Sequence, residues 1–349
     1  MTRPQDQRLL LVHAHPDDES AGTAGVIARA VADGRRVDLV VCTGGEEGEV
    51  HDPDLDPDEA RPRLRDIRMS ELACSVRALA GDAPHLRLEL LGYRDSGMMG
   101  TESNNHPDCF WQADLAEATR RLVGIVRRAK PSVLVGYDDN GGYGHPDHIQ
   151  AHRVAVAAFD AAADPSAFPG EGPPHAIEKL YEVAFNRDEW FGLMVEMRRR
   201  GIPLPWGMDE QLGEQLASAG GTAPPPAADG ESDPPAEAKE AAAEDAADIE
   251  DVRAVSWEVG AGVAPEDFGT ADADITTRVD VSAHLDAKRA SMDCHRTQRQ
   301  DLGWLLELPD DLVDRAMATE WFVLRRWRGR DVDAGARETD LFEGLSAPA

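Results

Sequence analysis

Cysteine is scarce in this chain of 349 residues. Four are present, and no two of them form a CxxC pair: Cys42, Cys74, Cys109 and Cys294. This spacing excludes a zinc cluster held by thiolates, and it fits a reducing cytosol better than a framework of disulfides. We expect Cys42, near the end of a predicted strand, to be a small buried residue rather than a nucleophile.

Basic residues are also in short supply. The chain has 36 Lys and Arg against 66 Asp and Glu, a formal net charge of −30, and a pI of about 4.6. So acidic a chain argues against nucleic acid or an anionic membrane as a partner. The charge is unevenly spread, because residues 209–251 hold 13 acids and one base and so carry −12 of the total.

Residues 1–7 show no signal-peptide pattern, and no apolar stretch approaches the length of a membrane span. We therefore expect a soluble, cytoplasmic protein. A dinucleotide-binding site is also disfavoured, because it needs GxGxxG after the first strand. The turn at that place reads HPDDE, residues 15–19, and its carboxylates would repel a pyrophosphate.

Short apolar runs alternate with helical patterns in the first half of the chain. Strands are predicted at 9–12, 37–42, 86–91 and 133–137, and helices at 20–33, 60–79, 115–129 and 146–162. This alternation predicts an α/β fold with a doubly wound, mainly parallel sheet and helices on both faces. In the less regular second half, strands are predicted at 177–185 and 275–281, and helices at 189–200 and 283–297.

Composition divides the chain into three parts. Residues 1–182 are predicted to form the metal-binding catalytic α/β domain. Residues 183–208 and 252–349 are predicted to form a smaller C-terminal α/β portion that completes the substrate pocket. Between them, residues 209–251 are rich in Ala, Pro and acids, and we expect this insert to be a disordered linker.

Two short runs of metal-binding residues follow two of the predicted strands. Residues 13–19 read HAHPDDE after the first strand, and residues 145–148 read HPDH after the strand at 133–137. In an open α/β sheet, ligands bind beyond the carboxyl ends of the strands. We therefore expect imidazoles and carboxylates from both runs to meet at one edge of the sheet.

His15, Asp18 and His148 are the predicted metal ligands. Two imidazoles and one carboxylate leave a position for water, which is the pattern of a catalytic zinc, one per subunit. Nitrogen and oxygen ligands also suit Fe²⁺, so zinc is favoured over iron rather than established. Asp17 lies between two of the ligands and is placed to take a proton from the water.

The other histidines have plainer interpretations. A single HxxD motif on a loop is weak, and only the joint occurrence of the two runs is specific. His13 alternates away from His15, so we expect a packed histidine or one that supports a ligand. His152 follows His148 by four residues. An HxxxH zincin site is the alternative there, but the glutamate it needs after His148 is missing.

The two runs, together with TGGEEGE at 43–49 and YRDSGM at 93–98, resemble the zinc-dependent deacetylases of the LmbE/PIG-L type. The likeness is to the actinobacterial branch that acts in mycothiol biosynthesis. It is dense over residues 8–182 and returns in HRTQ at 295–298 and ETDLF at 338–342. The acidic insert has no counterpart expected in that family.

The resemblance implies the same three ligands and Asp17 as the general base. It also implies that His145 stabilises and protonates the departing groups, and that Tyr143 polarises the amide carbonyl. The neighbouring carboxylate of Asp147 is expected to hold His145 in its charged form.

Substrate contacts are implied for two further residues. Arg68 and Asp95 match positions that hold the inositol end of the substrate, although a solvated helix residue and a turn former are the plain alternatives.

The resemblance implies hydrolysis of the N-acetyl group of N-acetylglucosaminyl-inositol, giving glucosaminyl-inositol and acetate, with a small amino-sugar/inositol molecule as the partner. The alternatives within the family are a mycothiol S-conjugate amidase and a deacetylase of another small N-acetyl sugar. A non-enzymatic alternative is an interaction protein that uses the acidic insert as a tether. Nothing in the sequence indicates the oligomeric state.

Overall fold

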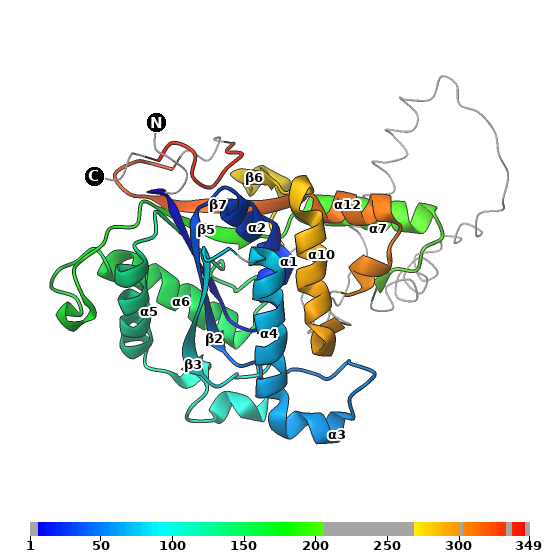
Figure 1. The fold of residues 1–349 in the computed structure, drawn as a ribbon, viewed down its shortest axis with the longest axis horizontal. Helices are drawn as coiled ribbons and strands as arrows, with labels where there is room; N and C mark the ends of the chain where they lie inside the picture. The colour runs from blue at the N-terminus through cyan, green and yellow to red at the C-terminus, as the bar shows by residue number, and fades with distance from the viewer. Residues whose placement is uncertain (1–5, 82, 206–268, 300–302, 333–336, 346–349) are drawn as a thin grey trace, which may run out of the picture. The chain divides into compact units, whose positions relative to one another are not determined.

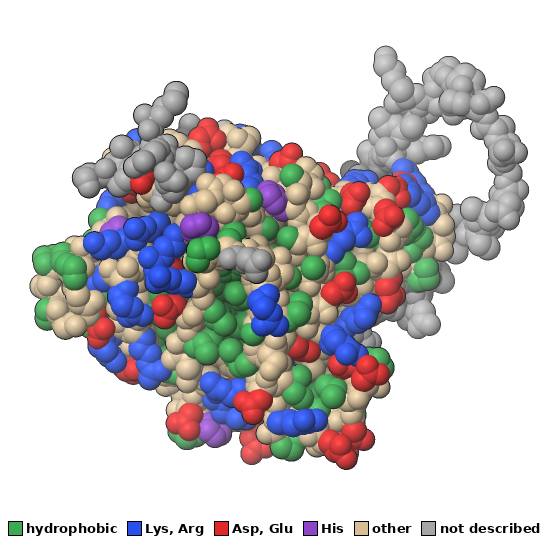
Figure 2. Space-filling view, in the orientation of Figure 1, with side chains coloured by type: hydrophobic (Ala, Val, Ile, Leu, Met, Phe, Trp, Pro, Cys, Tyr) green, Lys and Arg blue, Asp and Glu red, His purple; other side chains and the backbone are tan. Residues whose placement is uncertain are grey.

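The computed structural model describes residues 6–81, 83–205, 269–299, 303–332 and 337–345 (Figure 1). The predicted acidic linker, residues 209–251, lies outside these ranges. In the described part of the chain, no helix is long and apolar enough to cross a membrane. Acidic and basic side chains are interspersed on the face seen in Figure 2, so no single-sign patch dominates it.

A sheet of seven strands forms the frame of the molecule, in the order β3-β2-β1-β4-β5-β7-β6. The strands are β1 (Arg8–His13), β2 (Arg36–Thr43), β3 (Leu86–Tyr93), β4 (Val133–Gly136), β5 (Lys179–Ala184), β6 (Thr277–Asp280) and β7 (Thr319–Trp327). The first five are parallel, and β7 runs antiparallel to both of its neighbours. The predicted mainly parallel sheet is therefore confirmed.

The order of the strands reverses between β1 and β4. From β1 the chain moves outward to β2 and β3, then returns to place β4 on the other side of β1. At such a switch point the two following loops diverge and leave a crevice beyond the strand ends. The runs at 13–19 and 145–148 both lie at this end of the sheet.

Helices cover both faces of the sheet (Figure 1). The helices of the described ranges are α1 (Asp18–Gly22), α2 (Ala24–Ala32), α3 (Pro57–Ala60), α4 (Leu64–Ala80), α5 (Leu115–Ala129), α6 (Pro146–Ala161), α7 (Arg187–Arg199), α10 (Leu285–Cys294) and α12 (Asp310–Met317). Alternate residues of β1 point to opposite faces. Leu9 and Leu11 join the core under α2 and α4, and Leu10 and Val12 join the core under α5 and α6.

The C-terminal half contains elements that the sequence analysis did not predict. β7 and α12 were missed, and β7 inserts between β5 and β6. Two strands from the range 252–349 thus belong to the same sheet as the metal-binding runs. That residues 183–208 and 252–349 complete the substrate pocket stays a prediction.

Two compact units make up the chain. One consists of residues 1–185 and 273–349, and the other of residues 186–272. In the second unit, α7 begins after Asn186, whose side chain accepts hydrogen bonds from the backbone N–H groups of Asp188 and Glu189.

The cysteine spacing favoured a reducing cytosol over a framework of disulfides, but the structure contains one disulfide. Cys74 in the second half of α4 and Cys294 at the end of α10 form a disulfide across 220 residues of sequence, with their Cα atoms 5.6 Å apart. Distance along the sequence hid this pair, because α4 and α10 lie side by side in the fold (Figure 1). Cys42 is free and buried, as expected, and Cys109 is also free and buried.

Candidate metal centre

The first metal-binding run forms a tight turn between β1 and α1. Asp18 begins α1, and its Oδ2 accepts hydrogen bonds from the backbone N–H groups of Ala14 (3.0 Å) and His15 (2.7 Å). The same oxygen accepts a third bond, 2.7 Å long, from the hydroxyl of Tyr137 after β4. These donors fix the carboxylate of Asp18 beside the switch point.

The second run begins α6. His145 is the N-cap, and its Nδ1 accepts a hydrogen bond of 3.1 Å from the backbone N–H of Asp147. His148 lies in the first turn, and its Nδ1 is 3.0 Å from the carbonyl oxygen of Gly141. Because that carbonyl can only accept, Nδ1 carries the proton and Nε2 is left with its lone pair free for a cation.

The fold brings the three predicted ligands together. Nδ1 of His15 lies 3.2 Å from Nε2 of His148 and 3.6 Å from Oδ2 of Asp18. Nε2 of His148 lies 3.4 Å from Oδ1 of Asp18. Only 6% of His15 and 3% of His148 is exposed to solvent.

Two overlapping sets of side chains in the described ranges could hold a metal ion. One is His15, His145 and His148, and the other is His15, Asp95 and Asp147; within each set the ligand atoms lie within 4.8 Å of one another. His15 belongs to both sets and is the centre of the cluster. The donors are all nitrogen or oxygen atoms and all buried, which suits a divalent cation.

Asp147 supports His15 rather than His145. Its Oδ2 lies 3.3 Å from Nε2 of His15 and accepts the backbone N–H of Ser96 at 2.9 Å. Burial opposes a charge on His15, but Asp95 and Asp147 outweigh it and raise its pKa well above the usual value. The expectation that Asp147 keeps His145 charged is wrong. Burial, with the neighbouring His15 and His148, lowers the pKa of His145 to about 2.

The predicted base and the predicted substrate-binding arginine touch each other. Nη2 of Arg68 is 3.0 Å from Oδ2 of Asp17, and the guanidinium also donates to the carbonyl oxygens of Gly45 (2.9 Å) and Pro16 (2.6 Å). Burial raises the pKa of Asp17 to about 7, and Arg68 offsets part of that effect. Arg68 is only 3% exposed, so it is not the solvated helix residue of the plain alternative.

Asp95 is buried beside His15, whereas Tyr143 is exposed to solvent. Asp95 is 3% exposed; its Oδ1 accepts the backbone N–H of Gly97 at 2.8 Å and lies 3.6 Å from Nε2 of His15. Tyr143 is 37% exposed, and the centre of its ring is 5.0 Å from that of His148. Tyr143 therefore borders the cluster on its solvent side.

His13 and His152 do not join the cluster through their ring nitrogens. Nε2 of His13 contacts the hydroxyl of Thr23 at 2.9 Å, and its Nδ1 lies 3.3 Å from the hydroxyl of Tyr137, which donates to Asp18. His13 is therefore a packed histidine that also supports a predicted ligand, which covers both alternatives that were expected. Nδ1 of His152 lies 2.8 Å from the carbonyl oxygen of Tyr137. The zincin alternative, which needs His152 at the metal, is not favoured by this contact.

Comparison with known proteins shows the family. Residues 10–159, which include both runs, match PIG-L, described as GlcNAc-PI de-N-acetylase. The 1D-myo-inositol 2-acetamido-2-deoxy-alpha-D-glucopyranoside deacetylase of Thermobispora bispora is 39% identical over 97% of this chain and 99% of its own length. The protein of the same name from Streptomyces avermitilis is 40% identical over 98% of both chains. This chain belongs to the PIG-L family.

A further relative of the same name, from Thermobifida fusca, is 38% identical and covers 97% of this PIG-L chain and 99% of its own. Among solved structures, the conserved protein TT1542 from Thermus thermophilus is 21% identical and aligns with a TM-score of 0.47 over 92% of this chain and 95% of that one. PIG-L deacetylases are metal-dependent, and the cluster around His15 is able to hold a metal ion.

Sequence reasoning missed three polar residues of this region. Ser96 donates to Asp147 through its backbone N–H and its hydroxyl. Glu19 and His295 form a buried pair, with Nε2 of His295 2.7 Å from Oε1 of Glu19. Each lies inside a run that had been noted, YRDSGM for Ser96, HPDDE for Glu19 and HRTQ for His295, but nothing in the residue types indicated which partner each would take.

Proposed function

We propose that this chain hydrolyses the N-acetyl group of N-acetylglucosaminyl-inositol, giving glucosaminyl-inositol and acetate, as a step of mycothiol biosynthesis. The observation that carries the proposal is the sequence similarity of this chain to its relatives over nearly its whole length. Relatives that bear the name of this deacetylase are 37–40% identical and cover 97–98% of the chain, and both metal-binding runs lie in the segment that matches the family.

The metal of the proposal is one Zn²⁺ per chain, held by His15, Asp18 and His148. The residues fit it: two imidazole nitrogens and a carboxylate converge within 3.2–3.6 Å of one another. The other ring nitrogen of His148 faces the carbonyl oxygen of Gly141, and that of His15 faces the carboxylates of Asp147 and Asp95. Such acceptors usually support metal-binding histidines. Bound zinc would supply a water of lowered pKa and polarise the amide carbonyl. Fe²⁺ is the alternative ion.

Asp17 is the proposed general base. A base works best when its pKa lies near the pH of the reaction, and burial brings the pKa of Asp17 to about 7. The contact with Arg68 keeps the carboxylate pointing in one direction. Arg68 therefore positions the base in this proposal, in addition to the inositol contact expected from the resemblance.

His145 and Tyr143 are the proposed partners of the reacting amide. Tyr143 would donate its hydroxyl to the carbonyl oxygen as charge develops there. His145 would stabilise the departing amine and give it a proton. Burial and the neighbouring His15 and His148 lower the pKa of His145 to about 2, so its ring is neutral at neutral pH, and the proton that reaches the amine would be the one that Asp17 takes from the water. In this proposal the carboxylate of Asp147 orients the ring of His15 through Nε2. Asp95 faces the same nitrogen and would also contact the inositol end of the substrate.

Acetate release from purified protein tests the proposal. Three substrates are compared: N-acetylglucosaminyl-inositol, a mycothiol S-conjugate and N-acetylglucosamine. We expect the first to be hydrolysed fastest, activity to vanish after chelation, and zinc to restore it. A faster rate on the conjugate would favour the amidase, and a faster rate on the free sugar would favour a general N-acetyl sugar deacetylase.

A further inference from the structure

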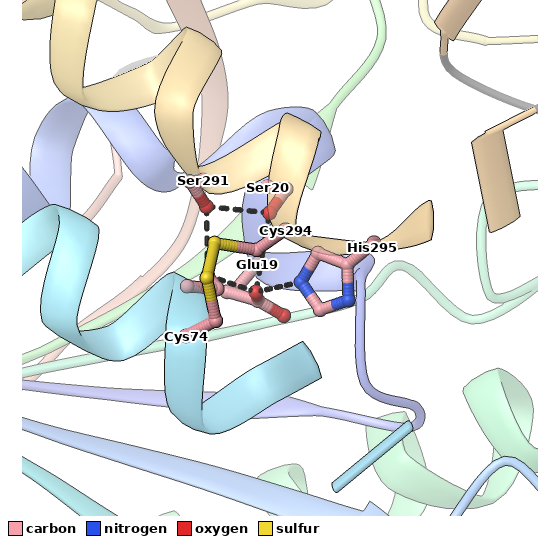
Figure 3. Close-up of a disulfide and its surroundings, with 7 residues drawn as sticks. Glu19, Ser20, Cys74, Ser291, Cys294 and His295 are labelled. Carbon is pink, nitrogen blue, oxygen red and sulfur yellow. Dashed lines mark hydrogen bonds and ion pairs between the residues drawn. A yellow bond between two sulfur atoms is a disulfide. The ribbon is translucent and has the colours of Figure 1, made fainter. Parts of the chain in front are cut away.

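A buried polar cluster contacts the backbone of Asp17 through Glu19, and Figure 3 shows the cluster with the neighbouring disulfide. We call it the Glu19 cluster. It joins α1, α4 and the end of α10, and it consists of Glu19, Ser20, Ser75, Ser291 and His295. The disulfide Cys74–Cys294 lies beside it. None of these residues belongs to the proposed ligands or to the groups that contact the amide.

Glu19 is the centre of the cluster and is fully buried. Its Oε1 accepts hydrogen bonds from Nε2 of His295 at 2.7 Å and from the hydroxyl of Ser75 at 2.5 Å. A buried carboxylate needs such donors, because burial without them is costly. The orientation of Glu19 is therefore set by α4 and by the residue that follows α10.

The other oxygen of Glu19 holds the backbone of the proposed base. Oε2 accepts the backbone N–H of Asp17 at 3.0 Å. Asp17 has φ 122° and ψ −29°, a conformation that L-residues rarely adopt and that persists only when surrounding contacts maintain it. The hydrogen bond to Glu19 is such a contact, so the direction of the Asp17 side chain depends on Glu19.

The disulfide is placed to hold this arrangement. Cys74 directly precedes Ser75 on α4, and Cys294 directly precedes His295. The covalent link thus lies one residue away from two of the donors to Glu19. Both cysteines are partly exposed, so a dithiol reductant can reach the disulfide and convert it to two thiols, with the reductant oxidised to its own disulfide.

We propose that Glu19 and His295 are positioning residues for Asp17, and that the disulfide Cys74–Cys294 keeps His295 against Glu19. The proposal rests on the proposed function in assigning Asp17 as the base. Its effect is on the placement of one catalytic group, so it predicts a loss of turnover without a loss of metal or of substrate binding.

Two substitutions of His295 separate positioning from folding. His295→Leu removes the donor to Glu19, and His295→Gln keeps an N–H at a similar distance from the backbone. We expect H295L to lower kcat by about tenfold to a hundredfold, the usual scale for a displacement of about 1 Å. KM and zinc content should stay within about twofold of wild type, as for an interaction made only in the transition state. H295Q should restore most of kcat.

Lys288→Gln, on the helix α10 that His295 follows, is the matched control. Lys288 is buried and pairs with Glu320 at 2.8 Å, and Glu320 binds the backbone N–H groups of Gly25 and Val26 rather than the Asp17 loop. K288Q should lower the melting temperature and leave kcat per folded molecule unchanged. Equal kcat losses in K288Q and H295L, or in H295Q and H295L, would overturn the positioning role.

The disulfide is tested by Cys74→Ser. C74S should lower kcat less than H295L does, and the double variant C74S/H295L should be no slower than H295L, because both changes act through one contact. Additive losses would overturn the part of the proposal that concerns the disulfide. If H295L does not fold, C74S decides: wild-type kcat in C74S would overturn that part as well.

Hydrogen exchange provides a readout that does not depend on activity. The backbone amides of residues 14, 15 and 17–20 should exchange faster in H295L and C74S than in wild type, and K288Q should leave them unchanged. If the wild type releases no acetate, the proposed function fails, while this exchange pattern still decides whether Glu19 and His295 hold the loop. Unchanged exchange in H295L would overturn the proposal whatever the activity.

Discussion

Three aspartates near His15, namely Asp17, Asp18 and Asp147, differ in their neighbours, and these differences determine their pKa values. Loss of solvent alone would raise the pKa of all three, and it does so for Asp17 and Asp147. For Asp18, the imidazoles of His148 and His15 and the hydroxyl of Tyr137 overcome burial and lower the pKa far below the usual range. Asp17, opposed only in part by Arg68, stays near 7. The adjacent residues Asp18 and Asp17 therefore differ in charge. Asp18 is held as an anion, and Asp17 can exchange a proton at neutral pH.

Replacing Asp17 should separate metal binding from turnover. Asp17→Ala and the isosteric Asp17→Asn remove the proton acceptor, and we expect each to lower kcat by about 10²–10⁴, the range for general base catalysis. Zinc content should stay at the wild-type level, because the carboxylate of Asp17 is not among the proposed ligands. Metal analysis and acetate release check both statements. Full activity in either variant would refute the assigned base.

Replacing Asp147 should lower the affinity for the metal without removing a proposed ligand. Asp147→Asn loses the charge that faces Nε2 of His15, and we expect zinc affinity to fall about tenfold to a hundredfold. Ser96→Ala, which deletes only the hydroxyl that donates to Asp147, should have a smaller effect in the same direction. Asp160→Asn on the same helix, whose carboxylate pairs with Arg326 instead, is the control. Competition with a chelator measures all three affinities.

Glu182 on β5 should make the fold less stable as pH rises. Burial raises its pKa to about 7, although Arg325 opposes this effect. The folded chain then binds more protons than the unfolded chain between pH 4.5 and 7, so stability falls across that interval. Glu182→Gln imitates the protonated form. It should be as stable as wild type at about pH 5 and more stable at about pH 8 by about 1–3 kcal/mol, at about 1.4 kcal/mol per pKa unit.

Denaturant unfolding at the two pH values measures this difference. Glu102→Gln, at an exposed position, is the control and should change stability equally at both. A wild-type chain that is more stable than E182Q at the higher pH would contradict the assigned effect of burial.

At the scale of helices and strands, the spacing of apolar residues predicted an element correctly where that spacing is regular along the whole element. The helix predicted at 115–129 agrees with α5 (Leu115–Ala129), whose N-terminus is capped by Asp114. The helix predicted at 20–33 is instead two helices, α1 and α2. Thr23 separates them, and its hydroxyl bonds to the carbonyl of Glu19 and to His13. Such a break follows from tertiary contacts and leaves no signal in the spacing of apolar residues.

The glycine turn before α6 offers a matched pair of substitutions. Gly141 and Gly142 both have positive φ, 65° and 80°. A Cβ on Gly141 would lie 2.5 Å from Cβ of His148 and 2.8 Å from the backbone nitrogen of Ile149, whereas a Cβ on Gly142 meets nothing within 4 Å. Gly142→Ala should therefore cost only about 1–2 kcal/mol of backbone strain. Gly141→Ala should also displace His148.

Zinc affinity distinguishes the two variants. We expect G142A to bind zinc as wild type does, and G141A to bind it at least about tenfold more weakly, as for the loss of a supporting contact. Equal affinities in the two variants would mean that the carbonyl of Gly141 does not orient His148.

At the scale of the whole molecule, the sequence predicted the place of the site because parallel strands end at one edge. That principle brings residues 15, 18 and 148 together whatever lies between them. It could not predict the contacts made by residues from the C-terminal half. Cys294 and His295 reach α4 and α1 only because β6 and β7 return the chain to the same sheet, and β7 itself was missed. Long-range pairing of this kind is specified by packing, not by local pattern.

The acidic insert should be dispensable for the reaction. The predicted site residues all belong to the unit of residues 1–185 and 273–349, and the insert was predicted from composition alone. Deletion of residues 220–250 should leave kcat and KM within about twofold of wild type, because shortening a loop changes its closure entropy only slowly with length. A variant with a Gly/Ser segment of equal length is the control. Lost activity in the deletion but not in this control would show that the length of the insert matters. Lost activity in both would show that its acidic composition has a role, and the tether alternative would then have to be considered again.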